Sequence, residues 1–164
     1  MFLTKLKRDS IAMSEYIDDF LPCRYTHSTL YVISPDISAD EISKRLQLKP
    51  SSVEIKGEKI RNHTIKQHSW SLISKDKVES KDSRRHIDWI IGLLIGKEDI
   101  ISDLQRGGAK FVIGCFWVSN SGRGGPILDS SQMKFLGESN IDLFWDVLFK
   151  SGVSDHENES DGEV

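Results

Sequence analysis

The sequence predicts an α+β fold, a ferredoxin-like sandwich in which a mainly antiparallel sheet carries its helices on one face. Helical and extended patterns alternate along the chain in a split β-α-β order, which is typical of this class. Residues 110–119 have apolar side chains on both faces, as expected of a central strand with a neighbour on each side. The apolar helix pattern before this strand must then cover one face of the sheet.

Length and composition fit one domain. The chain has 164 residues, of which 38% are hydrophobic, and this is enough for a buried core. It has 25 acidic and 22 basic residues, but five of the acidic ones lie in the last ten positions, so the body is nearly neutral. A neutral body argues against a nucleic-acid partner. No apolar segment has the length of a signal peptide or a membrane span, so we expect a cytoplasmic protein without membrane contact.

We expect the domain to cover residues 29–150. Residues 1–28 form a lead-in segment without a sustained period, and Met13 offers a second start for the chain. Residues 151–164 form an acidic tail with no aromatic residue. The tail has too little apolar surface to offset its ordering entropy, so we expect it to be disordered.

The first predicted elements are a strand and a capped helix. Residues 29–34 are rich in β-branched and aromatic side chains, which favours a strand. Ser38 and Glu41 have the spacing of a capping box, which indicates the start of a helix. Pro50 ends this helix, since proline cannot continue the helical hydrogen bonds. Residues 52–55 and 68–74 are the next extended segments, and the second has clear alternation.

A long helix is predicted before the central strand. Apolar residues between Ile87 and Leu104 recur at steps of three, four and seven, which places them on one helix face. Ser83 is the expected N-cap. Gly96 predicts a kink or short break, and Gly107 suits the left-handed position just past the helix end.

The chain after the central strand is predicted to form a turn, a short helix and a last strand. Residues 119–125 form the turn, and residues 127–128 are expected to re-enter the sheet. Ser130 is the expected cap of a helix that ends near Leu136. Residues 141–149 alternate between an apolar face and a mixed face, so we expect a partly exposed strand.

The predicted core consists of large apolar residues at the inward positions of these elements: Trp70, Trp89, Ile90, Leu94, Ile113, Trp117 and Trp145. The tryptophans are spread over the major elements, which favours packing over a shared ligand box. Cys23 and Cys115 are read as small buried hydrophobes rather than a disulfide or a reactive thiol.

The sequence indicates no catalytic residues, metal or cofactor. His63 and His68 lie in a polar stretch, and no second pair shares a face with them. Cys115 has no charged activator nearby in the sequence. Because no nucleophile-base pair, acid-base pair or metal cluster occurs at workable spacing, we expect a protein that is not an enzyme.

The glycine-rich turn after the central strand is the candidate partner-binding segment, with Asn120, Arg123, Gly124 and Gly125 as its residues. A phosphate-binding loop would need a following helix, whereas Pro126 favours an extended continuation. An arginine between glycines at the end of a rigid strand can reach a partner's carboxylate or backbone. An ordinary solvated turn is the alternative interpretation.

The chain resembles a bacterial family catalogued as domain of unknown function 4279, over about residues 29–149. The similarity lies in the motifs LQLKP at 46–50, KGE at 56–58, WSL at 70–72, HIDWI at 86–90 and FW at 116–117 with the later GG at 124–125. This resemblance implies a compact α+β domain and brings no established reaction. Some members look like immunity proteins of toxin systems.

The function expected from the sequence is a non-enzymatic protein-binding module. The family resemblance adds the more specific expectation of an immunity or inhibitor protein that binds a cognate toxin. A small-ligand-binding regulatory domain is the alternative, because an open sheet face can receive either a protein segment or a ligand.

Overall fold

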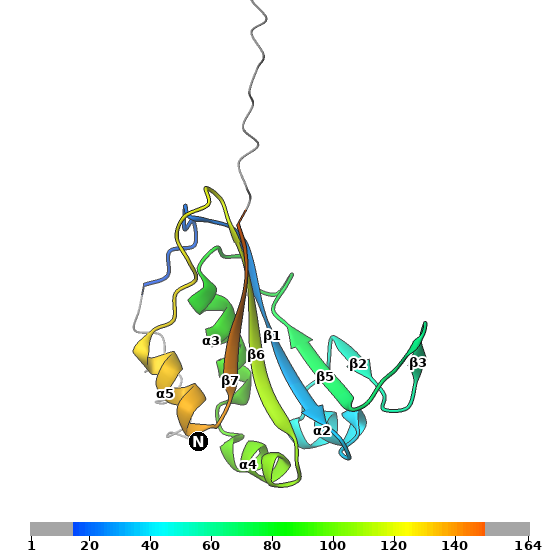
Figure 1. Ribbon diagram of the computed structural model, residues 1–164. Coiled ribbons are helices and arrows are strands. Elements are labelled where there is room, and N and C mark those ends of the chain that lie inside the picture. Colours follow the sequence, from blue (N-terminus) through cyan, green and yellow to red (C-terminus); the bar gives the residue numbers. More distant parts are fainter. Residues whose placement is uncertain (1–14, 150–164) are drawn as a thin grey trace, which may run out of the picture.

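The computed structural model describes residues 15–149 (Figure 1). Its five-stranded sheet consists of β1 (Cys23–Ser34), β2 (Ser52–Glu54), β5 (His68–Ile73), β6 (Lys110–Ser119) and β7 (Asp142–Phe149). The helices are α2 (Ala39–Leu46), α3 (Ser83–Leu94), α4 (Glu98–Arg106) and α5 (Ser130–Glu138). β3 (Lys59–Ile60) and β4 (His63–Thr64) form a separate two-stranded sheet. The predictions for residues 1–14 and for the acidic tail lie outside the described residues.

The strands lie in the order β2-β5-β1-β6-β7. β1 pairs antiparallel with both β5 and β6, and β2 pairs antiparallel with β5. β7 pairs parallel with β6, and the connection between them contains α5. The fold is therefore α+β with a mostly antiparallel mixed sheet. The prediction that residues 110–119 form an internal strand is confirmed, because β6 lies between β1 and β7.

The helices and the sheet enclose a core to which the predicted residues contribute unequally. Figure 1 shows α3 and α5 side by side along the sheet, and both contribute side chains to the buried interior. Trp70, Ile90, Leu94, Ile113 and Trp117 are fully buried, as predicted. The two remaining tryptophans, at positions 89 and 145, are only partly buried.

The start of α3 differs from the prediction, because its N-cap is Asp82 rather than Ser83. The carboxylate of Asp82 accepts a hydrogen bond from the Arg84 amide at 3.0 Å. Ser83 is the first helical residue, and its hydroxyl donates to the Ile127 carbonyl at 2.8 Å and accepts from the Ile127 amide at 2.9 Å. These two bonds occupy the backbone of Ile127, and residues 127–128 do not join the sheet as predicted.

The predicted long helix is divided into α3 and α4. Gly96 lies between them with a φ of +81°, so the break expected there is confirmed. The residue in the left-handed conformation after α4 is Gly108, with a φ of +92°, and not Gly107. Gly107 continues the helical turn, with a φ of −78°.

Three further boundaries follow from local hydrogen bonds. Ser38 accepts from the Glu41 amide at 3.2 Å, which confirms Ser38 as the N-cap of α2, but the return bond from the Glu41 side chain that would complete the predicted capping box is not formed. α5 is capped by Asp129 rather than Ser130, since Asp129 forms a capping box with Gln132. The helix also continues past its predicted end at Leu136 to residue 138.

The first strand begins six residues earlier than predicted, at Cys23 instead of Thr29. This additional part pairs with the second half of β6, so it belongs to the sheet and not to the lead-in segment. Cys23 and Cys115 are both buried and free, as predicted for small hydrophobes.

Candidate functional site

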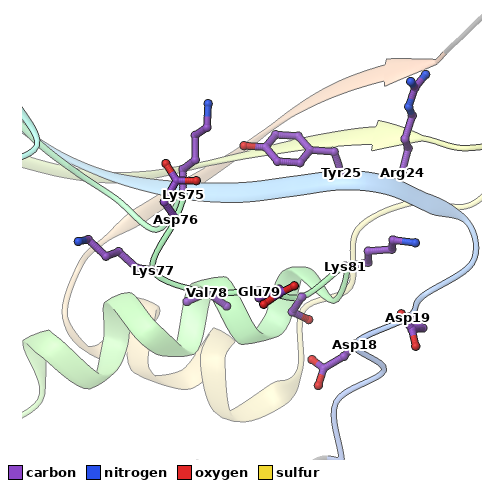
Figure 2. Close-up of a pocket in the computed structure, with 11 residues that line it drawn as sticks. Asp18, Asp19, Arg24, Tyr25, Lys75, Asp76, Lys77, Val78, Glu79 and Lys81 are labelled. Carbon is purple, nitrogen blue, oxygen red and sulfur yellow. The ribbon is translucent and has the colours of Figure 1, made fainter.

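The side of the sheet opposite α3 carries exposed and half-buried aromatic and apolar side chains from three adjacent strands. We call it the outer face and define it by six residues: Tyr25, His27 and Tyr31 of β1, Phe116 of β6, and Phe144 and Leu148 of β7. The strand register places these side chains in neighbouring rows, and successive residues of each strand point to opposite faces. Figure 2 shows Tyr25 on the side of the strands away from α3. Tyr25 is 38% exposed, Phe144 48% and Leu148 51%.

The outer-face rings form two groups, and the rings within each group are in contact. His27 lies 5.4 Å from Tyr25 and 5.2 Å from Phe116, measured between ring centroids. Tyr31 and Phe144 are nearly parallel, with an interplanar angle of 21° and a centroid distance of 6.4 Å. Because the rings stand on strands held by ladder hydrogen bonds, the backbone fixes their positions.

Gly114 permits the approach of the second ring pair. A Cβ atom at this position would lie 2.6 Å from Cζ of Phe144 and 3.1 Å from Cε2 of Tyr31. Any larger residue would therefore displace a ring. A hollow of about 230 Å³ is lined by Gly114 and the neighbouring rings, and we call it the aromatic hollow. Besides Gly114 and four of the rings, its lining includes the carboxylate of Asp146.

The charges around the aromatic hollow are uneven. Burial, together with the charges of His86 and Lys75, lowers the pKa of His27, so its imidazole is neutral near pH 7. Asp146 lines the hollow, and Asp142 lies on the same face of β7. Within residues 15–149, neither carboxylate forms an ion pair. The hollow therefore has a negative lining.

A larger depression of about 930 Å³ lies at the end of the sheet near Tyr25 (Figure 2). The segment 75–81 forms one wall, with lysines and acidic residues interleaved, and residues 18–19 and Arg24 complete the lining. Since both signs of charge are mixed along the whole rim, the depression favours neither an anion nor a cation.

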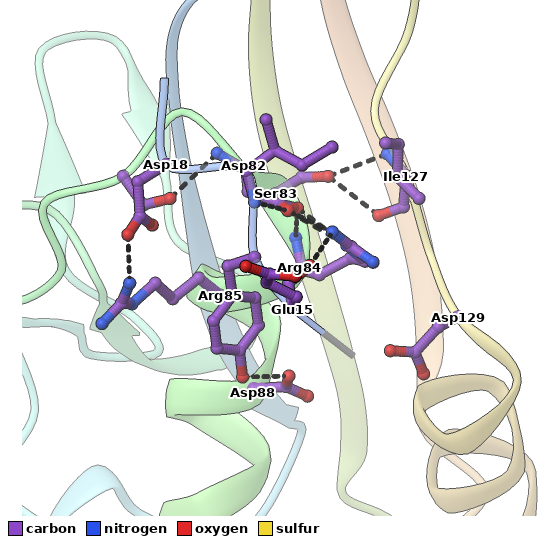
Figure 3. A network of polar contacts seen from close by, with 12 residues as sticks. Glu15, Asp18, Asp82, Ser83, Arg84, Arg85, Asp88, Ile127 and Asp129 are labelled. Atoms are coloured by element: carbon purple, nitrogen blue, oxygen red, sulfur yellow. Dashed lines mark hydrogen bonds and ion pairs between the residues drawn. The ribbon is translucent and has the colours of Figure 1, made fainter. Parts of the chain in front are cut away.

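The segment before β1 is fixed to the start of α3 by buried polar contacts (Figure 3). The amide of Ile17 donates to Asp82 at 2.9 Å, and the Arg84 guanidinium forms an ion pair with the same carboxylate. Burial opposes ionisation of Asp82, but the hydrogen bonds from Arg84 and Ile17 hold its pKa below the ordinary value. The hydroxyl of Tyr16 donates to Asp88 at 2.7 Å. These groups satisfy one another, which indicates a structural role.

Gln132 of α5 donates to the second oxygen of Asp88 at 2.8 Å. Burial raises the pKa of Asp88 despite the hydrogen bonds from Tyr16 and Gln132. An aspartate with a raised pKa is a feature of some active sites. Here both of its oxygens are occupied by neighbours within the fold, so Asp88 links residue 16, α3 and α5.

Ser74 and His86 have the separation of a nucleophile-base pair, 2.8 Å from Oγ to Nδ1. Both residues are buried, with exposures of 0% and 2%. The other ring nitrogen of His86 donates to the Ser80 carbonyl at 2.9 Å, and the Ser28 amide donates to Ser74 Oγ at 2.9 Å. No substrate can reach an oxygen enclosed in this way, so the pair holds the loop after β5 against β1.

The predicted partner-binding turn is packed at its base against residues 21–22. The Asn120 amide donates to the Pro22 carbonyl at 2.8 Å. Gly124 has a φ of +84°, and a Cβ atom there would lie 2.6 Å from Cβ of Pro22. Gly125 is half-buried, whereas Arg123 is exposed, and its carbonyl accepts from Ser119 Oγ at 3.0 Å. None of the four predicted residues lines the aromatic hollow.

Sequence reasoning did not identify the residues of the aromatic hollow. A usable signal is present, since aromatic residues or histidine occur at positions 25, 27 and 31, all of one parity. The late predicted start of the first strand hid this pattern, because Tyr25 and His27 fell in the lead-in segment.

Residues 15–149 contain no group of three or more histidine, cysteine, aspartate or glutamate residues that could hold a metal ion. Within the same range, no helix has the length and apolar character needed to cross a bilayer.

The comparisons with known proteins identify a family. No curated protein and no solved structure matches the chain significantly. A family model described as "Domain of unknown function (DUF4279)" matches residues 24–150, which is most of the chain. The start of this match agrees with the observed start of β1 at Cys23. The chain therefore belongs to the family of domains of unknown function DUF4279.

Proposed function

We propose that this protein is a non-enzymatic binding module for another protein, and that the partner lies on the outer face of the sheet. The observation that carries the proposal is the set of rings and apolar side chains on this face, with Tyr25, Phe144 and Leu148 exposed and the β6 ring Phe116 half-buried among them. Aromatic residues are enriched at protein interfaces, and clustered exposure of this kind marks interaction sites.

The edge strand β7 also supports partner binding at the outer face. β7 pairs only with β6 among the described strands, so its other edge is open. Leu148 and Phe149, at its end, are 51% and 59% exposed. A partner seated on the outer face can therefore extend over this edge, where free backbone groups and apolar side chains are both available.

We infer that the body of the domain is a ferredoxin-like sandwich to which α5 and β7 are added. The order β2-β5-β1-β6 with antiparallel pairing supports this, because β1-α2-β2-β5-α3-α4-β6 then follows the split β-α-β order of that fold. The added β7 widens the sheet and contributes Phe144 and Asp146 to the aromatic hollow.

The partner that we favour is a toxin, with this protein acting as its immunity or inhibitor protein in the cytoplasm. Support for this more specific role comes from the family resemblance, and the exposed outer face fits it. Aromatic anchors on rigid strands lose little conformational entropy when a partner binds, which suits a tight inhibitor.

The second candidate is a regulatory domain that binds a small ligand. The aromatic hollow favours this function, since its volume of about 230 Å³ would accept a small group between rings. Tyr25 and Leu148 are exposed on the outer face without lining the hollow, and this is why we place the protein partner first.

A capture experiment from the native host tests the proposal. The full chain should retain one protein in stoichiometric amount, and Phe144→Asp should abolish the retention. Met133→Asp is the matched control, because Met133 is an apolar residue of α5 that is exposed to 53%, similar to Phe144. Loss of the partner with both variants, or retention of the partner by both, would contradict binding through the outer face.

A further inference from the structure

The aromatic hollow has the composition of a site for a planar cation. Four rings line it, in two contacting pairs: Tyr31 with Phe144, and His27 with Phe116. Backbone at Gly114 forms part of its floor, where no side chain projects. Asp146 adds one carboxylate to the lining. Ring faces and a carboxylate both attract positive charge.

We propose that the aromatic hollow receives an arginine side chain of the protein partner, with the guanidinium group against the rings and paired with the carboxylate of Asp146. The proposal rests on the proposed function, since it names the chemistry by which the outer face recognises its partner. Arginine fits better than lysine because its planar guanidinium group stacks on rings and can donate two parallel hydrogen bonds to one carboxylate.

The electrostatics of the hollow favour this occupant over an anionic or neutral one. His27 is held neutral by burial, so it does not repel a cation near pH 7. Lys75 lies on the same side of the sheet but lines the larger depression and not the hollow. An acidic side chain would meet Asp146 without a compensating cation in the lining. A neutral side chain would cover Asp146 and leave a desolvated, unpaired charge.

The test uses a peptide that presents one arginine in an extended chain, acetyl-Gly-Val-Arg-Val-Gly-amide. Its control is the same peptide with citrulline, which has a similar shape without the positive charge. Binding to the full chain is followed by NMR through the amide signals of Gly114 and Phe116. We expect a dissociation constant of about 1 mM for the arginine peptide and binding at least about tenfold weaker for the citrulline peptide.

Two variants of β7 locate the charge that binds the arginine. Asp146→Asn should weaken binding of the arginine peptide about fivefold or more, because it removes the paired carboxylate. Asp142→Asn is the matched control, since Asp142 is exposed on the same strand and face without lining the hollow. The Asp142→Asn variant should bind the peptide within about twofold of the unmodified chain, because screening by salt limits the effect of a charge outside the site. Thermal unfolding of both variants verifies that they fold.

Equal binding of the citrulline peptide, or full binding by Asp146→Asn, would overturn the proposal. Tighter binding of tetramethylammonium than of the arginine peptide would also overturn it, in favour of a free small cation. If Phe144→Asp abolishes partner capture while the arginine peptide does not bind, this inference fails and the proposed function stands. If capture does not depend on the outer face, the proposed function itself fails.

Discussion

The two faces of the central strand differ in what covers them. On one face of β6, Ile113 and Trp117 are fully buried. On the other face, Gly114 and Phe116 border the aromatic hollow. Alternation along one strand thus places core residues and residues of the aromatic hollow next to each other in the sequence. The difference indicates that substitutions at odd and even positions of β6 should affect different properties.

The largest expected effect is on the helix-covered face. Trp117→Ala or Ile90→Ala should lower the free energy of unfolding by about 2–5 kcal/mol, because each leaves a cavity in the core. Phe144→Ala on the outer face should cost less than about 1 kcal/mol, since its side chain is already half exposed. Denaturant unfolding measures both. Similar costs for Trp117→Ala and Phe144→Ala would remove the distinction between the two faces.

The polar network at the start of α3 sharpens the comparison, because it is structural without being apolar. Asp82→Asn should lower the free energy of unfolding by about 3 kcal/mol, since Arg84 would keep a buried charge without its partner. Asp18→Asn is the control. Asp18 pairs with Arg85 in an exposed position, so the loss should stay below about 1 kcal/mol. Urea unfolding of the two variants measures both losses. A larger loss for Asp18→Asn than for Asp82→Asn would contradict a structural role for the buried pair.

Gly124 tests the base of the turn after β6. Gly124→Ala should lower the free energy of unfolding by about 1–2 kcal/mol, because the left-handed backbone is strained for alanine and the added Cβ meets Pro22. Gly125→Ala is the control, since no atom lies within 4 Å of a Cβ there and its φ is not positive. An unchanged midpoint for Gly124→Ala would show that the turn does not pack on residue 22.

The pH dependence should arise mainly from the helix-covered face. Burial lowers the pKa of His86, so the unfolded chain binds more protons than the folded protein below the ordinary histidine pKa of about 6.5. The stability contributed by neutral His86 is therefore complete above that value and falls as the pH decreases below it. His86→Gln should flatten the fall measured by unfolding at several pH values, with a smaller slope remaining from His27. A slope identical to that of the unmodified chain would exclude His86 as its source.

Arg123 should give the smallest effect on stability. Arg123→Glu changes an exposed side chain, so the melting temperature should stay within about 1 °C. If the turn takes part in recognition, as its sequence predicts, this variant should still weaken the captured complex. Calorimetry and the capture experiment measure the two properties. Full retention of the partner by Arg123→Glu would limit recognition to the outer face.

The sequence predicted the elements better than their ends. β6 was predictable because two apolar faces leave one interpretation, an internal strand. The caps of α3 and α5 were not, since aspartate at 82 or 129 and the adjacent serine are both good N-cap residues and tertiary contacts decide between them. The Ser83 hydroxyl donates to the Ile127 carbonyl instead of capping the helix. Each predicted N-cap therefore lies one residue after the observed N-cap.

The outer face could not be predicted because it depends on register. Tyr31 and Phe144 are far apart in the sequence and meet only because β7 aligns parallel to β6, which places Phe144 beside Gly114. No local pattern specifies that alignment. The hollow also needs the absence of a side chain at position 114, and a glycine within an apolar strand has several explanations when it is read from sequence alone.

Side-chain oxidation by hydroxyl radicals, compared between the free protein and its captured complex, tests the central claim most directly. Tyr25 and Phe144 on the outer face and Met133 on α5 are all exposed, so each should be oxidised in the free protein. Binding through the outer face predicts that oxidation of Tyr25 and Phe144 falls several-fold, on the order of the exposure they lose, while that of Met133 stays unchanged. Protection of Met133 with full reactivity of Phe144 would contradict the account.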